Sequence, residues 1–516
     1  MEKYFNIAGP CNEKSHYMVP VLKRIKAIDR LVRQGHYFVI HAPRQTGKTT
    51  LIKALVNHYN SEANYYALYC SLESVQVFTE PERGIPEISD NIRLALKYSN
   101  LPHNLEFVKT TTQNYSTQIS EGLRDYCSIL DKPLIIFFDE IDGLQNGTLV
   151  TFLRQLRDSY ISRPEITFVH CIALVGMRNI RDYRSKIRDT QQTLGSASPF
   201  NIISEALTIK NFLFSDIESL YLQHTQATGQ VFEKTALEKV FEQTDGQPWL
   251  VNAIAREIIQ NILEDDHAQK ITEELVQQAI QNIILRRDTH IDSLFDKLKE
   301  PRVRKIIEPI ILGKPNEISI SSDDTQYCMD LGLIKIFDGE ILPANKIYNE
   351  VIIRTLSYDS QFELIHKIKP DWVDDHCNID MTRLIKGFQQ FWRENADIWV
   401  EKYEYKEAAP HLILQAFLQR VINGGGTILR EYASGRERMD LCVIFGNNKY
   451  PIELKIRYSK SVVQEGIEQL ANYMTTLGEA TGWLVIFDRD TAKKWDEKIF
   501  WVTENYEGKT IHVVGC

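Results

Sequence analysis

One ten-residue segment constrains the fold of this chain more than any other: His41-Ala42-Pro43-Arg44-Gln45-Thr46-Gly47-Lys48-Thr49-Thr50. It follows a short apolar run at 36–41 that predicts a strand, and a helical segment begins at Lys48. Such a strand–loop–helix unit cradles phosphate, because backbone N–H groups and the helix N-terminus face the anion. Lys48 would reach the terminal phosphates, and the Thr49 hydroxyl would bind Mg²⁺. We expect a nucleotide to contact the loop residues Ala42, Pro43, Arg44, Gln45, Thr46, Gly47, Lys48, Thr49 and Thr50.

The loop departs from the GxxxxGK[ST] pattern at Ala42, which stands where the first glycine is expected. Alanine tolerates most loop geometries except a positive φ, so this departure weakens the match only slightly. Downstream, the apolar run 134–138 predicts a strand that ends in Asp139 and Glu140. Asp139 would hold Mg²⁺ through water, and Glu140 would polarise an attacking water. A chance turn beside a buried strand is the competing interpretation, and the order of the two elements disfavours it.

Short apolar runs at 64–71, 133–139 and 167–176 predict further strands, with helical stretches between them. Continuous apolar strands that alternate with helices indicate a parallel sheet covered on both faces. The last of these strands leads into Arg178, which would lie at the carboxyl edge of the sheet and read the γ-phosphate. A solvated or structurally paired arginine explains Arg178 equally well.

Two regions of different character follow the predicted sheet. Apolar residues recur at helical spacing over 215–285, so this region should be an all-helical bundle. The segment 300–357 predicts a winged helix, with helices at 303–312 and 321–332 and a hairpin that turns at Asp338-Gly339. Its second helix carries aspartates and neither lysine nor arginine, which argues against a role in reading a DNA groove.

A second cluster of chemical interest lies near the end of the chain. Glu453 and Lys455 project to the same side of one predicted strand, and Asp440 comes from the neighbouring strand. A divalent cation would compensate these carboxylates, so Asp440, Glu453 and the carbonyl of Leu454 would hold Mg²⁺. Lys455 would orient or help to deprotonate the water that attacks phosphorus. A solvated amphipathic hairpin is the alternative, since patterns of this kind are individually common.

Three further side chains are candidates for this cluster. Glu407 begins a predicted helix at 407–422 that should pack beside the strands, and Glu431 lies near the end of a strand. Gln469, on the helix after the Lys455 strand, is placed to support Lys455 or to contact the DNA backbone.

With these residues in place, the chain resembles bacterial AAA-like ATPases that carry a C-terminal PD-(D/E)XK nuclease-like domain. The segments that carry the resemblance are 16–20, 42–49, 198–202, 405–410, 423–426, 430–432, 438–441 and 452–455. The stretch Asp245-Gly-Gln-Pro-Trp249 also resembles the GxP motif of the STAND branch, in which the proline, here Pro248, packs near adenine. The resemblance implies catalytic roles for Glu407, Asp440, Glu453 and Lys455. It also implies a role in nucleic-acid transactions or in defence against foreign DNA.

The predicted fold class is therefore a multidomain α/β protein. We expect an AAA-like P-loop ATPase core with a parallel sheet at 1–214, a helical lid at 215–295, a winged helix at 296–360, a helical linker at 361–400 and a mixed α/β nuclease-like domain at 401–516. A chain of 516 residues is long enough for several cores of this size.

The composition of the chain also predicts where in the cell the protein lies. The eight cysteines lack CxxC pairs, no run approaches roughly 20 apolar residues, and the N-terminus lacks the features of a signal peptide. We therefore expect a cytoplasmic protein without a membrane span. The net charge of −9 neither favours nor excludes nucleic acid, because a basic groove can lie on an acidic protein.

Together these features predict an ATP-dependent or ATP-regulated DNA endonuclease, with ATP and Mg²⁺ as cofactors and DNA as the partner. Two alternatives remain: a nucleotide switch whose nuclease-like domain is inactive, and a DNA-binding regulator. The sequence leaves RNA open as a substrate, is compatible with a homo-oligomer and does not identify the trigger.

Overall fold

The structure is a computed structural model of the full chain. It describes residues 3–20, 27–62, 64–102, 114–177, 202–286, 296–311, 322–352, 372, 379–402, 409–423, 426–434, 437–446, 448–457, 460–488 and 493–516. The chain forms two compact units: Met1–Leu294 with Ser319–Tyr348, and Phe295–Ile318 with Asn349–Cys516.

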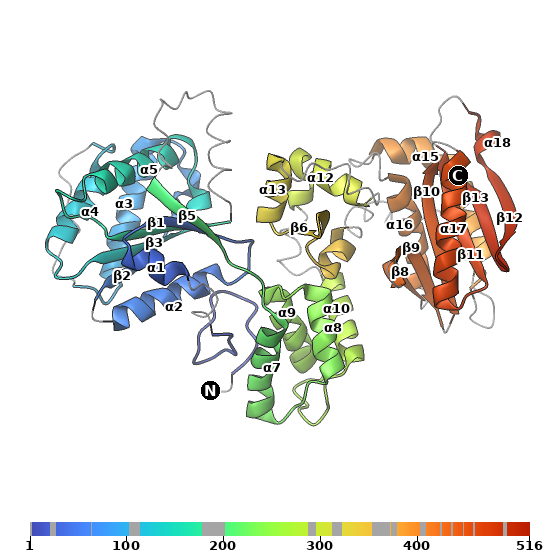
Figure 1. Ribbon diagram of the computed structural model, residues 1–516, viewed down its shortest axis with the longest axis horizontal. Helices are drawn as coiled ribbons and strands as arrows, with labels where there is room; N and C mark the ends of the chain where they lie inside the picture. Colours follow the sequence, from blue (N-terminus) through green and yellow to red (C-terminus); the bar gives the residue numbers. More distant parts are fainter. Residues whose placement is uncertain are drawn as a thin grey trace. The chain divides into compact units, whose positions relative to one another are not determined.

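A five-stranded parallel sheet forms the core of the first unit (Figure 1). Its order is β2 (Tyr66–Ser71), β3 (Leu134–Asp139), β4 (Cys171–Gly176), β1 (Tyr37–His41) and β5 (Ile203–Thr208). The inner strands β1, β3 and β4 are almost entirely apolar because both faces of the sheet are covered, as predicted. Since all strands run the same way, their carboxyl ends meet at one edge, where the loops after β1 and β3 come together.

Helices cover the two faces of this sheet. One face packs against α1 (Ala27–Arg33) and α2 (Lys48–Ser61), and the other against α3 (Pro81–Lys97), α4 (Gln118–Ser128) and α5 (Asn146–Ile161) (Figure 1). The short helices η2 (Glu73–Val77) and η3 (Ile141–Gly143) lie after β2 and β3. Strand β5 was not predicted: its residues alternate between half-buried and exposed, so it lacks the continuous apolar run of the inner strands.

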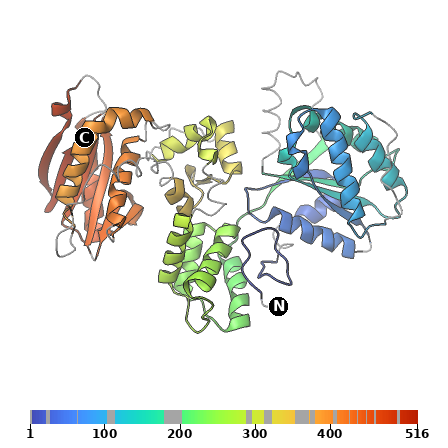
Figure 2. The same cartoon turned by 180° about the vertical axis from the view of Figure 1, so that it is seen from behind.

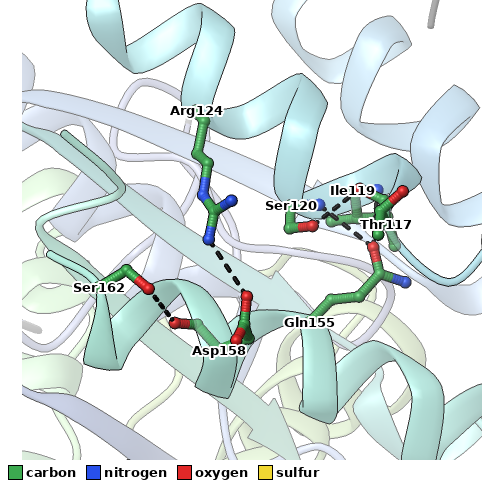
Figure 3. A network of polar contacts seen from close by, with 7 residues as sticks. All are labelled: Thr117, Ile119, Ser120, Arg124, Gln155, Asp158 and Ser162. Carbon is green, nitrogen blue, oxygen red and sulfur yellow. Dashed lines mark hydrogen bonds and ion pairs between the residues drawn. The ribbon is translucent and has the colours of Figure 1, made fainter. Parts of the chain in front are cut away.

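A polar network joins α4 to α5 at the outer layer (Figure 3). The first-turn N–H groups of Ile119 and Ser120 donate to Gln155 Oε1 at 2.8 and 3.2 Å. Arg124 and Asp158 form an ion pair at 3.3 Å between the same helices. The buried amide of Gln155 therefore satisfies backbone donors that a helix N-terminus leaves without partners.

The helical bundle predicted at 215–285 is present. It comprises α7 (Phe214–Thr228), α8 (Lys234–Thr244), α9 (Pro248–Arg256), the π-helix η5 (Glu257–Ile262) and α10 (Glu273–Arg286). The N-terminal segment packs on this bundle through ring contacts: Phe5 lies 5.4 Å from Tyr221, and Tyr17 lies 5.6 Å from His224. We call this bundle the lid.

The region predicted to be a winged helix contains two helices and a hairpin within the described residues. They are α12 (Pro301–Ile311), α13 (Asp323–Asp330), β6 (Ile334–Phe337) and β7 (Glu340–Pro343). The hairpin turns at Asp338 and Gly339, which have φ values of 50° and 81°, as a tight hairpin turn requires. The two compact units divide this region, with α12 in one and α13 and the hairpin in the other.

A six-stranded mixed sheet forms the core of the second unit. Its order is β12 (Phe500–Tyr506), β13 (Lys509–Gly515), β11 (Thr481–Asp488), β10 (Asn448–Arg457), β9 (Glu437–Phe445) and β8 (Gly426–Ser434). Strands β8, β9 and β10 are antiparallel, whereas β10 and β11 are parallel and are joined by α17 (Lys460–Leu477). The last two strands, β12 and β13, were not predicted.

Helices cover both faces of this sheet as well. Helix α17 packs on one face, and α15 (Met381–Lys402) and α16 (Ala409–Asn423) pack on the other (Figure 2). A short helix, α18 (Trp495–Lys498), precedes β12. Phe388, Phe391 and Trp392 of α15 are buried in the core of this unit.

The described residues include most of the cysteines and the helices that were considered as possible membrane spans. Seven of the eight cysteines lie in the described ranges, and all seven are free thiols. Among the helices that the structure describes, none is long and apolar enough to cross a bilayer.

Candidate functional sites

The phosphate-loop candidate lies between β1 and α2, at the carboxyl edge of the parallel sheet. Two loop residues have left-handed backbones, Gln45 with φ of 57° and Gly47 with φ of 89°. Ala42 is not among the described residues that have a positive φ, and it is fully buried. Alanine is therefore compatible with this position, and the departure from the glycine pattern has a structural explanation.

Lys48 is the first residue of α2 and lies inside the loop. Its Nζ donates to the carbonyl oxygens of Ala42 and Pro43, both at 2.9 Å. Burial lowers the pKa of Lys48, while the nearby carboxylates, of which Glu140 contributes most, raise it. The ammonium is thus a buried cation bonded to neutral carbonyls, and phosphate oxygens would be stronger, charged partners for it.

Thr49 and the end of β3 meet beside this lysine. Thr49 Oγ1 donates to Asp139 Oδ2 at 2.9 Å, and the Tyr69 hydroxyl donates to the same oxygen at 3.1 Å. Asp139 is 1% exposed, and its other oxygen accepts from the backbone N–H of Glu140 at 3.0 Å. A threonine hydroxyl adjoining an aspartate carboxylate is the oxygen donor set that nucleotide-bound Mg²⁺ requires, so these residues fit the ion.

Glu140 follows directly and has a left-handed backbone with φ of 60°. Burial and the neighbouring Asp139 raise the pKa of Glu140, while Lys48 lowers it. Non-glycine residues in this conformation are uncommon and cluster at functional sites. The carboxylate expected to polarise water is therefore half-buried, close to Lys48, and held in an unusual backbone conformation.

Several contacts of this site were not predicted. Asp142 accepts a hydrogen bond from the backbone N–H of Met177, and a Cβ on Gly176 would lie 2.5 Å from its carboxylate. His41 lies 3.0 Å from Thr208 Oγ1 and 3.8 Å from Asp330. In the sequence, Asp142 lies near the Asp139-Glu140 motif and His41 near the phosphate loop. The residues that they contact are far away in the sequence, so local pattern does not predict these contacts.

The lid and the N-terminal segment both approach the loop. Gln247 Nε2 donates to the carbonyl of Gln45 at 3.5 Å, and Pro248 is the buried first residue of α9. Trp249 Nε1 donates to the carbonyl of Ile7 at 2.9 Å, and the N–H of Cys11 donates to Thr50 Oγ1 at 3.0 Å. These contacts bring residues 7–11, α9 and the start of α2 together. Arg178 lies outside the described residues.

The second candidate site lies on the α17 face of the mixed sheet. Asp440 Oδ2 on β9 accepts from the backbone N–H of Leu454 on β10 at 2.8 Å. Lys455 Nζ lies 3.0 Å from Glu453 Oε1 and donates to Gln469 Oε1 on α17 at 2.6 Å. The structure thus brings Asp440, Glu453, Lys455 and Gln469 together. Glu407 lies outside the described residues, and Glu431 lies in β8.

Glu453 is shielded from solvent, so its carboxylate is not hydrated as an exposed metal ligand would be. Glu453 is 3% exposed, and within the described residues its Oε2 has no hydrogen-bond partner. Burial, reinforced by Asp440, raises the pKa of Glu453 to about 8, and burial also raises the pKa of Asp440. The cause is α17, which covers this face of the sheet and could not be placed from local pattern.

Only a few oxygen ligands in this cluster could bind a divalent cation. The buried Oε2 of Glu453 and the adjacent Asp440 are suitable oxygen ligands, and a cation would offset their burial. Among the described residues, no group of three or more Asp, Glu, His or Cys side chains is arranged around a common metal position.

A buried histidine on α16, His411, also lies near this cluster and was not predicted. Burial and the charge of Lys455 lower its pKa to about 4, so this imidazole is neutral at ordinary pH.

Comparison with known proteins adds two family matches. A family model described as an AAA-like domain matches residues 8–353, and one described as a domain of unknown function matches residues 381–491. No curated protein matches the chain significantly.

Solved structures similar to this chain include the following three. The Walker-type ATPase PABY2304 of Pyrococcus abyssi is 14% identical, with a TM-score of 0.47 over 67% of this chain and 99% of that chain. The RuvB Holliday junction branch migration motor of Thermotoga maritima is 12% identical, with a TM-score of 0.32 over 64% and 93%. Cdc6p from Pyrobaculum aerophilum is 14% identical, with a TM-score of 0.34 over 66% and 96%. Since all three TM-scores lie below 0.5, we base no functional argument on these structures.

Proposed function

Because the chain belongs to the AAA-like domain family over residues 8–353, we propose that it binds ATP with Mg²⁺ and hydrolyses ATP. The observation that carries this proposal is the Thr49–Asp139 hydrogen bond beside the buried ammonium of Lys48. Two motifs 90 residues apart in the sequence thereby form one site that matches the charge of a metal–triphosphate complex.

Each side chain has a distinct role in the proposed site. Lys48 would exchange its two carbonyl partners for phosphate oxygens, and Thr49 and Asp139 would hold the magnesium ion. The ion supplies positive charge that stabilises the transferring phosphoryl group. Glu140 would accept hydrogen bonds from water at the edge of the sheet and orient it.

We extend the proposal to the second unit as a metal-dependent endonuclease acting on DNA. Two observations support it. The mixed sheet with helices on both faces in 409–488 agrees with the mixed α/β nuclease-like domain that the family resemblance implies. The Asp440, Glu453, Lys455 and Gln469 side chains then meet on one face of that sheet. Nucleotide state would gate cleavage, with a role in nucleic-acid transactions or in defence against foreign DNA.

One observation favours a second candidate, a nucleotide-dependent switch whose nuclease-like unit no longer cuts. The Glu453 carboxylate is buried, its pKa is raised to about 8, and the described residues supply only two carboxylates. A neutral Glu453 would bind Mg²⁺ poorly at pH 7. Such a unit would still offer a surface for nucleic acid or protein, with nucleotide state controlling recruitment.

A plasmid-cleavage assay with Mg²⁺, run with and without ATP or a non-hydrolysable analogue, separates the two candidates. The endonuclease proposal expects cleavage by the wild-type protein and its loss in Asp440→Ala, with ATP hydrolysis retained in both. ATP hydrolysis without cleavage of DNA or RNA substrates, under any nucleotide condition, would favour the switch. Absence of ATP binding would contradict the first part of the proposal.

A further inference from the structure

A cavity of about 300 Å³ lies between the N-terminal segment and the lid. Lys3, Tyr4 and Tyr17 line it from the segment, and His224 and Arg256 line it from the lid. No residue of the phosphate loop contributes to its wall, so it is distinct from the proposed ATP site. Pockets that bind small molecules have volumes of roughly 300–1,000 Å³, and this cavity lies at the lower limit of that range.

Aromatic rings form much of the cavity wall. The Tyr17 and His224 rings meet edge to face at 5.6 Å, and Phe5 contacts Tyr17 at 4.9 Å. Tyr4, which is 43% exposed, lies 4.7 Å from His16, measured between ring centroids. Walls of this kind accept planar groups, because a flat ring packs against aromatic faces and edges over a large area.

The charge of the wall is mainly positive. Lys3 and Arg256 are cationic, and Asp265 is the one carboxylate among the described residues that line the cavity. Arg256 Nε donates to Gln260 Oε1 at 2.8 Å, which fixes the guanidinium. Within the described part of the chain, its two terminal nitrogens contact no acceptor, and this pair of donors matches a carboxylate or phosphate group.

An irregular backbone supports the same wall. Ile259 and Gln260 belong to the π-helix η5, and the turn after it places Glu264 and Asp265 at φ values of 48° and 61°. Single π-turns are rare and occur often at functional sites, and positive φ at a non-glycine residue is costly. The irregular backbone thus coincides with the cavity wall at Ile259, Gln260 and Asp265.

We propose that this cavity binds a small planar anion, of the class of a nucleoside monophosphate or an aromatic carboxylate. The rings of Tyr4, Tyr17 and His224 hold the planar part. The Arg256 guanidinium pairs with the anionic group in a two-point contact, and Lys3 adds a second positive charge to the wall.

The position of the cavity would allow a bound ligand to affect the nucleotide site. The same N-terminal segment bonds to Trp249 of α9 and to Thr50 of α2. A ligand that holds this segment against the lid therefore changes the affinity for ATP, and ATP changes the affinity for the ligand by the same factor. This second effect rests on the proposed ATP site, whereas binding in the cavity does not.

Calorimetric titration of the full chain with AMP, CMP and benzoate tests the proposal. Wild type, Arg256→Gln and the matched control Lys234→Gln are compared; Lys234 belongs to the lid, and its side chain is 80% exposed. We expect at least one probe to bind wild type and Lys234→Gln with equal Kd, and Arg256→Gln at least tenfold more weakly. The same titration in Lys48→Ala excludes the phosphate loop, because cavity binding persists there. The monophosphates and benzoate distinguish the two sources of the anionic group.

Three results would overturn the proposal. They are no binding of any probe at millimolar concentration, equal binding by Arg256→Gln and wild type, and loss of binding in Lys48→Ala. If Arg256→Gln unfolds at a lower temperature than wild type, Tyr4→Ala replaces it, because this half-exposed ring can be removed without opening the core. If wild type fails to bind ATP, the proposed function is contradicted, but titration with AMP, CMP and benzoate still tests binding in the cavity.

Discussion

Glu453 carries a titratable carboxylate into the contact between β10 and α17, where its ionised form loses most of its hydration. Burial raises the pKa of Glu453 to about 8 in the folded chain from an ordinary value of 4.5. Because the folded chain holds the Glu453 proton more tightly than the unfolded chain, protonation stabilises the folded state. This contribution is complete below the pKa of Glu453 in the unfolded chain. It is lost as pH rises through the pKa of Glu453 in the folded chain. The second unit should therefore be less stable at alkaline pH when no metal is bound.

The first prediction concerns this pH dependence. In EDTA, unfolding of the second unit should require less urea at about pH 9 than at about pH 6, a loss on the order of 2 kcal/mol. Tryptophan fluorescence reports mainly on this unit, since Trp249 is the only tryptophan before residue 372. Glu453→Gln should remove most of the difference, whereas Glu504→Gln, at an exposed position on β12, should retain it.

Added Mg²⁺ completes this test at about pH 9. A metal bound by ionised Glu453 and Asp440 stabilises the folded state by mass action, so the urea midpoint of wild type should rise and that of Glu453→Gln should not. An unchanged wild-type midpoint would contradict the proposed metal site. Identical pH profiles for wild type and Glu453→Gln would contradict the raised pKa.

The second prediction concerns Lys48. Lys48→Ala should weaken ATP binding at least tenfold, or about 1.4 kcal/mol, because it removes the charge that neutralises the terminal phosphates. Lys97→Ala, at an exposed position on α3, serves as the matched control. Calorimetric titration measures both, and equal ATP affinity in the two variants would contradict the assignment.

The third prediction separates binding from hydrolysis at Glu140. Glu140→Gln should bind ATP as wild type does and hydrolyse it roughly 10²-fold more slowly, because the amide cannot accept the proton of the attacking water. Steady-state phosphate release measures the rate. Hydrolysis at the wild-type rate would exclude Glu140 from the reaction.

Local patterns predicted some of these residues and not others, for a physical reason. Short sequence motifs contain the predicted residues, and the residues next to them in the sequence indicate their chemistry. These predicted residues are Lys48, Asp139, Asp440, Glu453 and Lys455. The Thr49–Asp139 bond followed from the placement of two motifs at one sheet edge. The His41–Asp330 contact joins residues almost 300 positions apart, and no local pattern encodes such a contact. The burial of Glu453 likewise depends on where α17 packs.

At the scale of elements, strands such as β1, β3 and β4 were predictable because they are continuous apolar runs. Strands β5 and β12 lie at sheet edges and expose alternate or successive residues, so their sequences resemble those of loops. The predicted strand at 167–176 begins later, at Cys171, since residues 167–170 precede the ladder with β3. Hydrophobic pattern therefore locates continuously apolar strands better than strands that expose part of their side chains.

The fourth prediction concerns the turn between α13 and β6. Gly332 has φ of 75°, and a Cβ there would lie 2.7 Å from Pro43 in the phosphate loop. Gly332→Ala should displace this turn from the loop, weaken ATP binding several-fold and cost about 1–2 kcal/mol of stability. Gly339→Ala is the matched control: its φ is 81°, and nothing lies within 4 Å of an added Cβ.

ATP titration and thermal unfolding of both glycine variants measure this effect. Gly339→Ala should lose similar stability through backbone strain and keep its ATP affinity. If both variants bind ATP equally well, the contact between the turn and Pro43 has no influence on the nucleotide site.

At the scale of the whole molecule, the fifth prediction is that the two sites are coupled. Nucleotide binding would favour one arrangement of the lid and winged-helix elements, and that arrangement would set nuclease activity. Each tenfold change in the active population requires about 1.4 kcal/mol of differential affinity. Lys48→Ala should therefore change cleavage in the plasmid assay, although Lys48 and Asp440 belong to different units.

The reciprocal variant is the control for coupling. Asp440→Ala should leave ATP hydrolysis largely intact, because the metal cluster supplies no group to the ATPase reaction. If Lys48→Ala cuts several substrates as wild type does, with and without ATP, the two activities are merely fused in one chain.

The division of the chain into units also bears on how the protein is made. The backbone passes between the units three times, at residues 294–295, 318–319 and 348–349. During synthesis, the ribosome releases Phe295–Ile318 before Ser319–Tyr348, so the first unit cannot be completed until part of the second has emerged. No single cut yields two self-sufficient pieces, since any break leaves one unit without a segment. Exchange of the second unit between such proteins by recombination would therefore require three matched junctions rather than one.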